Sequence, residues 1–234
     1  MGLLDVFRPD RTEVGAARSA LEEARSGKAD GGAIDRVVRL VMEVGIDGRG
    51  PLPSAPAVAT RALEASGGDI EAAVRAVGRF AVRWGAVGGF VTGLGGFATM
   101  PVALPANLLE FYVQATRMAA AIATLRGYDV REPEVRTAVM LTLVRSDTDE
   151  VLRKVGMTTA SGRMTTFALR KLPPSALMMV NKAVGFRLLR GVSERFLLRL
   201  GRAVPLVGGA VSGVLDAWMM SRIAAHARRQ LPRL

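Results

Sequence analysis

Apolar side chains recur every three or four positions along most of this chain, which is the spacing of one face of an α-helix. In residues 32–44, for example, Ile34, Val37 and Val41 fall on one face, and Gly45 is expected to end that helix. No segment alternates apolar and polar residues between hairpin turns, so no β-sheet is predicted. The pattern predicts an all-α fold, a compact multi-helix bundle.

Capping residues and prolines mark where these helices are expected to begin and end. Ser, Thr and Asp side chains accept hydrogen bonds from the first N–H groups of a helix, and proline suits its first turn. Glycine suits the residue after the last turn, because it adopts positive φ without strain. These rules predict N-caps at Asp10 or Thr12, at Ser54 and at Asp69, a stop at Gly127, and helix starts at Pro133, after Pro173-Pro174 and at Pro205.

A loop rich in glycine and proline divides the chain unequally. Residues 46–56 hold two glycines and three prolines, which prevent regular structure. We therefore predict an N-terminal helical region at residues 1–50 and a larger helical domain at residues 51–234.

The longest stretch without a charged side chain is residues 84–109. Its 26 residues would be enough to cross a bilayer, for which about 20 suffice. However, six glycines and two prolines lie within it. We predict two helices separated by a break between Gly93 and Pro105, the second helix beginning between Pro101 and Pro105. The element is interpreted as the central hairpin of the bundle, apolar, broken by glycine and proline, and buried or re-entrant.

Glycines recur at helical spacing in two apolar segments. Gly85, Gly89 and Gly93 leave one helix face without side chains, and Gly209 and Gly213 do so near the C-terminus. Another backbone can approach such a face closely, either within a membrane or in a bundle in water. The spacing predicts close helix packing and leaves both environments open.

One narrow polar stripe follows the charge-free stretch. Asn107, Glu110, Gln114 and Arg117 fall at i, i+3, i+7 and i+10, so they share one side of a helix. The stripe is either the hydrated side of an amphipathic helix or an inward-facing row that binds a ligand. Under the second interpretation Glu110 and Arg117 would need Gln114 or water between them. Asp216, which lies within another apolar run, is the fifth candidate for this ligand-binding site.

The positive charge of the chain is confined to its C-terminal part. The net charge is +11, yet residues 1–150 carry 17 Lys and Arg against 19 Asp and Glu, a balance of −2. Residues 151–234 carry 15 against two, a balance of +13. Such an excess predicts an anionic partner. The candidate residues for binding anionic lipid share one side of a predicted helix: Arg187, Arg195, Arg199 and Arg202.

That basic helix has two interpretations. A helix with arginines on one side and apolar residues on the other can lie on an anionic membrane surface. It can equally pack its apolar side in the core and leave its arginines in water.

Enzyme motifs are absent from the sequence. There is no cysteine, the single histidine, His226, has no second His or Cys for a zinc site, and no phosphate-binding loop or nucleophile elbow occurs. Acidic pairs such as Asp147 and Asp149 suit helix starts. We expect no catalytic residue, no metal and no cofactor, and a protein that is not an enzyme.

Parts of the chain resemble the EcsC family. The resemblance rests on residues 89–129, which contain TGLGGF and LRGYD, followed by EPEVRTAVM and VPLVGGAVSGVLDAWMMSRIAAHA, and it covers roughly residues 55–230. Members are helical bacterial proteins of undefined activity, named for a protein encoded beside an ABC transporter and linked to secretion. The resemblance therefore implies a helical accessory protein associated with membranes, and Asn is expected in many relatives where this chain has Asp216.

Three functions from different classes follow from these observations. The first is a non-enzymatic accessory protein, cytoplasmic and peripheral to or partly inserted in the cytoplasmic membrane, which contacts anionic lipid through its basic C-terminal third. The second is a soluble helical domain that binds a lipid or another apolar small molecule. The third, binding of nucleic acid, is disfavoured, because only two Trp and two Tyr are available to stack on bases. No protein partner is predicted.

Overall fold

The fold was analysed in a computed structural model, which describes residues 9–26, 32–94, 96–144, 169, 172–199 and 205–234. Within these ranges the side chains of residues 91–104, 191–199 and 205–210 are not described. The regular elements formed by the described residues are helices, and an isolated bridge pairs Arg49 with Leu52. The predicted all-α bundle is confirmed for this part of the chain.

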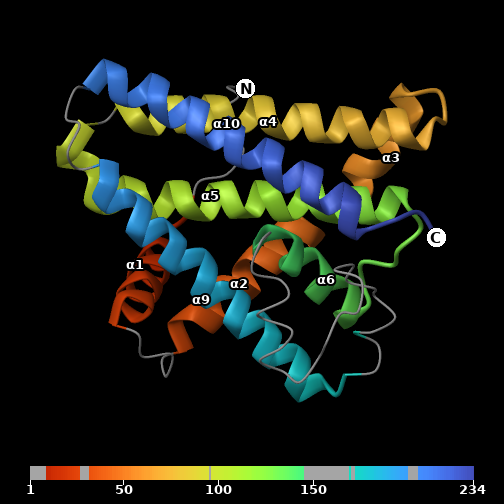
Figure 1. The fold of residues 1–234 in the computed structure, drawn as a ribbon, viewed down its shortest axis with the longest axis horizontal. Helices are drawn as coiled ribbons and strands as arrows, with labels where there is room; N and C mark the ends of the chain where they lie inside the picture. Colours follow the sequence, from red (N-terminus) through yellow and green to blue (C-terminus); the bar gives the residue numbers. More distant parts are fainter. Residues whose placement is uncertain (1–8, 27–31, 95, 145–168, 170–171, 200–204) are drawn as a thin grey trace.

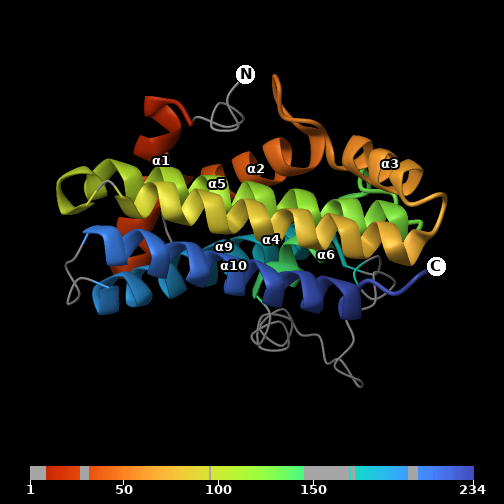
Figure 2. The same cartoon turned by 90° about the horizontal axis from the view of Figure 1, so that it is seen from above.

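Two long antiparallel helices form the centre of the molecule (Figure 1). They are α4 (Ile70–Leu94) and α5 (Gly96–Leu125). Helix α10 (Pro205–Gln230) packs across one face of this pair, and its closest association is with α4. The second view shows that the N-terminal helices α2 (Gly32–Met42) and α3 (Ala55–Ala65) lie on the opposite face (Figure 2).

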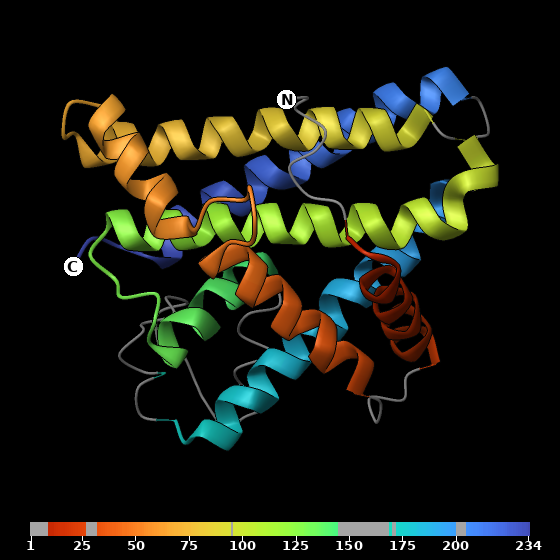
Figure 3. The same ribbon diagram turned by 180° about the vertical axis from the view of Figure 1, so that it is seen from behind.

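Three helices of the described residues remain: α1 (Arg11–Ser26), α6 (Pro133–Val144) and α9 (Pro174–Arg199). Helices α1 and α6 pack against α5 at different points along its length, and α9 contacts α1, α2 and α6. Their arrangement is plainest from behind, where α1, α2 and α9 lie below α5 (Figure 3). Buried residues from α1 through α10 form one hydrophobic core. The boundary at residue 50 stays a prediction, although the helices on either side of it share that core.

The predicted helix caps are largely confirmed. At α1 the Glu13 backbone N–H donates to Asp10 Oδ1 at 2.8 Å, and the Asp10 N–H donates to Glu13 Oε2 at 3.0 Å, a reciprocal capping box. The Ala72 N–H donates to Asp69 Oδ1 at 3.0 Å at the start of α4. Gly127, with φ of +91°, ends α5.

The expected stop at Gly45 is wrong. The helix continues as a π-helical turn, η1 (Glu43–Asp47), and ends at Gly48, where φ is +78°. Gly45 instead permits a close helix contact, because a Cβ atom there would lie 2.8 Å from Thr116 Cβ and 3.0 Å from the Val113 carbonyl oxygen of α5. A glycine placed for packing resembles a stop signal in the sequence, and only the tertiary contact distinguishes them.

The predicted break between Gly93 and Pro105 is also wrong in its length. Helix α4 runs to Leu94 and α5 begins at Gly96, so Pro101 and Pro105 both lie within α5. Each proline removes one backbone hydrogen bond and disfavours a helix interior by about 3 kcal/mol or more. The long buried segment of α5 after Pro105 outweighs this cost, since nearly every residue from Leu108 to Leu125 packs against another helix.

A buried arginine joins the ends of three helices. Arg126, at the end of α5, donates from Nη1 to the Arg228 and Leu231 carbonyl oxygens at 2.5 and 2.6 Å, which caps the end of α10. Its Nη2 donates to both carboxylate oxygens of Glu71, at the start of α4. The Leu234 N–H returns a hydrogen bond to the Arg126 carbonyl at 3.1 Å. The C-terminal residues are therefore fastened to the central pair.

The length and hydropathy of the helices show whether any of them, including those formed by the charge-free stretch 84–109, could cross a bilayer. Within the ranges that the structure describes, no helix is both long enough and apolar enough to cross a bilayer.

Candidate functional site

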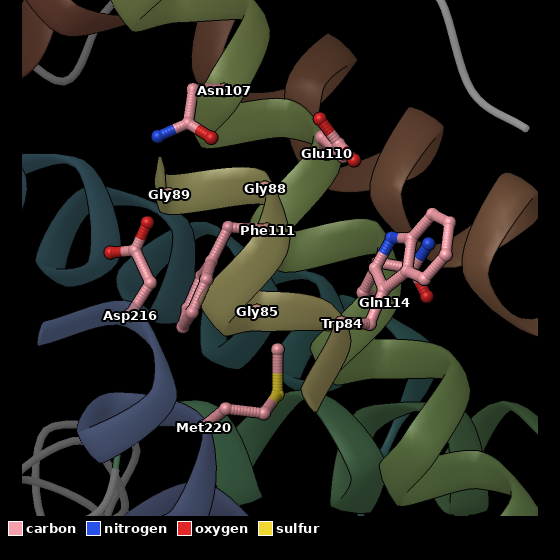
Figure 4. A pocket seen from close by; sticks show the side chains of 10 residues that line it. All are labelled: Trp84, Gly85, Gly88, Gly89, Asn107, Glu110, Phe111, Gln114, Asp216 and Met220. Atoms are coloured by element: carbon pink, nitrogen blue, oxygen red, sulfur yellow. The ribbon is translucent and has the colours of Figure 1, made fainter. Parts of the chain in front are cut away.

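Most of the predicted polar stripe meets at one pocket between α4, α5 and α10 (Figure 4). Asn107, Glu110 and Gln114 reach it from α5, and Asp216 reaches it from α10. The structure therefore brings together four of the five candidate ligand-binding residues that were predicted from the sequence. The full lining is Trp84, Gly85, Gly88, Gly89, Asn107, Glu110, Phe111, Gln114, Asp216 and Met220.

Glycines allow α10 to approach α4 at this pocket. A Cβ atom on Gly89 would lie 2.5 Å from Asp216 Oδ2 and 2.8 Å from the Ser212 carbonyl oxygen. A Cβ atom on Gly213 would lie 2.7 Å from the Ala86 carbonyl oxygen. The close backbone approach predicted from the glycine spacing is therefore present. Gly93 and Gly209 lie in parts of the two helices whose surroundings are not described.

The Glu110 carboxyl is mostly withdrawn from water. Burial raises its pKa, and the negative charge of Asp216 raises it further, whereas the Trp84 indole favours the ionised form. The Trp84 N–H is itself buried and makes no hydrogen bond of standard geometry, so its attraction for the carboxylate is weak. The neutral carboxylic acid is consequently favoured more at Glu110 than at an exposed glutamate.

Arg117, the fifth candidate, does not line the pocket and is 6% exposed. Its Nη2 donates to Gln114 Oε1, whereas its Nη1 is buried without a hydrogen-bond partner. Burial lowers the pKa of this guanidinium to about 10. Within the described part of the chain no carboxylate pairs with it. The inward-facing interpretation of the stripe holds for Gln114 and Arg117, while Asn107 and Glu110 stay partly exposed.

The pocket is small. The space open to the centre of a water molecule is about 10 Å³, which matches roughly one water. Ligand sites for drug-sized molecules measure several hundred Å³, so an acyl chain does not fit in this conformation. Nor do the described residues contain a cluster of three His, Cys, Asp or Glu side chains that could hold a metal ion. The groups present are suited to holding a proton or a water molecule.

Comparisons of the chain with protein-family models, with curated proteins and with solved structures find no match. The resemblance to the EcsC family stays a prediction.

The predicted basic site is only partly described. Arg187 lies in the middle of α9 and is partly buried. Arg195 and Arg199 lie on the last two turns of α9, but their side chains are not described, and Arg202 lies outside the described residues. What the backbone establishes is that the arginine-bearing end of α9 lies near the start of α10 and the adjoining ends of α4 and α5 (Figure 1).

We call this region the junction end: the last turns of α4 and α9 with the first turns of α5 and α10. Large apolar side chains are exposed on α4 and α10 as these helices approach it, at Val87, Phe90, Val211 and Val214. The exposed apolar residues of α4 and those of α10 lie side by side, since a Cβ atom on Gly213 of α10 would be 3.4 Å from Phe90 Cβ of α4.

Trp218 continues the exposed apolar surface along α10. Half of its surface is accessible, and the Arg222 guanidinium carbon lies 5.5 Å from the centre of its ring. Sequence reasoning missed this surface, because α10 is apolar nearly all round. The spacing of Val211, Val214 and Trp218 at i, i+3 and i+7 is the signal that could have found it.

Proposed function

We propose that this protein is an accessory protein, not an enzyme, that docks on an anionic membrane surface with its junction end. The observation that supports this best is the exposure of Phe90, Val211 and Val214 on neighbouring helices at that end. Exposed large apolar residues gathered on one surface are typical of a contact with a membrane or a protein.

Charge favours the membrane over a neutral protein partner. The C-terminal segment 151–234 carries the +13 excess, and α9 brings Arg195 and Arg199 to the junction end. Basic residues near an anionic bilayer contribute about 1 kcal/mol each. Each fully buried Val or Phe side chain contributes about 1.5–3 kcal/mol. The two contributions add, so loss of either should weaken the binding.

The charge-free stretch 84–109 supplies the element that would enter the interface. Its middle forms the last turns of α4 and the first turns of α5, at the junction end. A helical junction without charges can sit among lipid head groups without the desolvation cost of an ion. The proposed contact is therefore peripheral or shallowly inserted.

Vesicle flotation tests this proposal. The protein should float with vesicles containing phosphatidylglycerol and much less with phosphatidylcholine vesicles, and salt should weaken the binding. Val214→Ser should reduce flotation several-fold. Met178→Ser is the matched control, because Met178 is equally exposed, at 68% against 69%, but lies at the other end of α9. Equal loss in both variants, or no flotation of the unmodified protein, would refute the docking surface.

The cellular role extends the same proposal. On the strength of the EcsC resemblance, we propose that the docked protein serves a transport or secretion system. Membranes from cells that contain the protein should release it in high salt if the basic contact dominates. Resistance to a carbonate wash would indicate insertion of the junction end, and recovery only in the supernatant would exclude membrane docking in the cell.

A further inference from the structure

One side of α4 changes from basic to apolar as the helix approaches the junction end. Arg83, Val87 and Phe90 are all exposed and lie at i, i+4 and i+7, so they share one side of the helix. Arg75, two turns before Arg83, is also exposed. Along α4 the exposed arginines therefore come first, and the exposed apolar residues follow.

The exposed side of α10 shows the same change. Val214 and Trp218 are exposed in the first half of this helix, and the exposed side chains of Arg222 and Arg229 follow. The Arg222 guanidinium carbon lies 5.5 Å from the centre of the Trp218 ring. Because α10 begins at the junction end and α4 finishes there, both helices place apolar residues near that end and arginines farther from it (Figure 1).

The packing of α4 on α10 sets Arg83 and Arg222 in the same turn of the helix pair. A Cβ atom on Gly85 would lie 3.4 Å from the Asp216 carbonyl oxygen and 3.6 Å from Met220 Cβ. Counting away from the junction end, Arg83 comes two residues after Gly85 on α4. In the same direction Arg222 comes two residues after Met220 on α10. We call Arg83 and Arg222 the inner arginines.

The inner arginines have no acidic partner among the described residues. Side chains of a helix lean towards its N-terminus. Arg222 therefore leans towards the junction end and over Trp218, whereas Arg83, which starts nearer that end, leans away from it. The two opposite inclinations bring the guanidinium groups to a similar distance from the junction end.

That distance suits the head groups of a bilayer. Arg83 lies four residues from Val87 and seven from Phe90, which corresponds to about 6 and 10 Å along the helix axis. The apolar face of an interfacial helix is buried about 5–10 Å into the boundary between head groups and acyl chains, and the head-group region of one leaflet is about 5–8 Å thick. When the apolar residues of the junction end reach the acyl chains, the inner arginines lie among the phosphate groups. Trp218 suits the same level, since tryptophan is enriched where membrane meets water.

We propose that the inner arginines bind the phosphate groups of anionic lipids and thereby set the depth at which the junction end docks. The proposal rests on the docking function above and names its ligand. The planar guanidinium pairs with two phosphate oxygens through parallel hydrogen bonds. The charge count alone did not point to Arg83, because acids elsewhere in residues 1–150 offset the arginines of α4.

Flotation on phosphatidylglycerol vesicles over a range of lipid concentrations, in about 0.15 M salt, tests the inference with the variant R83Q/R222Q. The control is R75Q/R229Q, which makes the same change in net charge on the same two helices. Its arginines lie eight and seven residues farther from the junction end, or about 12 and 10 Å along the axis. That separation exceeds the Debye length of about 8 Å, so the lipid charge is largely screened there.

The variant R83Q/R222Q should bind the vesicles about 10–30-fold more weakly than the unmodified protein, and R75Q/R229Q less than about threefold more weakly. Circular dichroism shows that both variants are folded. An equal loss in the two variants, or no loss in either, would mean that total charge or apolar contact suffices. The inference is then overturned and the docking proposal stands. If the unmodified protein does not float, the docking proposal fails, and the inference fails with it.

Duplex DNA serves as a second polyanion in the same salt. The inference predicts that R83Q/R222Q and R75Q/R229Q bind DNA equally weakly. A loss of DNA binding confined to R83Q/R222Q, with flotation unchanged, would assign the inner arginines to nucleic acid and overturn the inference.

Discussion

Gly89 of α4 lies so close to Asp216 of α10 that a Cβ atom on the glycine would be 2.5 Å from the carboxylate oxygen Oδ2. The same Cβ atom would be 2.8 Å from the Ser212 carbonyl oxygen, which belongs to the backbone and cannot turn away. Together with the contact between Gly213 and the Ala86 carbonyl oxygen, this contact sets a short distance between the two helices, and Asp216 lines the pocket that Glu110 shares.

Replacement of Gly89 by alanine is therefore expected to force α10 away from α4. We expect Gly89→Ala to lower the free energy of unfolding by about 1–3 kcal/mol, the usual cost of overpacking. Gly88→Ala is the control, since its Cβ atom would meet nothing closer than 3.7 Å and alanine favours a helix by about 1 kcal/mol over glycine. Urea unfolding measures both. Equal stability of the two variants would contradict the close contact.

The hydrogen bond from Arg117 to Gln114 gives a second prediction. Gln114→Leu should destabilise the protein by about 1.5–3 kcal/mol, because it leaves a buried guanidinium without its acceptor. Arg117→Met should cost much less, since it removes the charge along with its need for a partner. In the double variant most of the loss should disappear. Additive losses in this double-mutant cycle would mean that the two side chains do not depend on each other.

Arg126 supplies a third prediction. Arg126→Met removes the cap of α10, and we expect a loss of about 2–3 kcal/mol with faster hydrogen exchange in the last turn of α10. Glu71→Gln weakens only the ion pair, and Glu71 is half exposed, so about 0–1 kcal/mol is expected. If the Glu71 variant proves the more destabilising, the ion pair and not the cap holds the C-terminus.

The pH dependence of stability follows from Glu110. Its pKa is raised in the folded state, so its contribution to stability is fully present below the unfolded pKa and is lost as pH rises through the folded pKa. Glu110→Gln should therefore be more stable than the unmodified protein near neutral pH, with the difference shrinking as the solution is acidified. Thermal unfolding at several pH values measures this. A difference that grows on acidification would contradict the raised pKa.

Much of the fold could be predicted from the sequence, because its signals are local. Asp10, Asp69 and Gly127 mark helix ends through hydrogen bonds or φ values that involve only nearby residues. The predictions at Gly45 and Pro105 were wrong because the structure there depends on distant parts of the chain. Gly45 permits a close contact with Thr116, far along the chain. Pro105 is tolerated inside α5 because the whole helix is stabilised by its packing.

The pocket, too, could be predicted where its signals are local and not where they depend on tertiary packing. Asn107, Glu110 and Gln114 could be placed on one side of a helix from their spacing alone. That Trp84 and Phe111 complete the lining depends on how α4, α5 and α10 pack together, which no local pattern specifies. The exposed surface at Val214 and Trp218 was missed because hydropathy alone does not show which side of an apolar helix stays uncovered.

The fluorescence of a tryptophan at position 90 tests docking by the junction end most directly. The chain has two tryptophans, so Phe90→Trp combined with Trp84→Phe and Trp218→Phe leaves a single reporter, at an exposed position in the last turns of α4. On vesicles of phosphatidylglycerol its emission should shift to shorter wavelength, and lipids brominated along their acyl chains should quench it. Binding to the vesicles without a shift or quenching would place another surface on the membrane and contradict the proposed orientation.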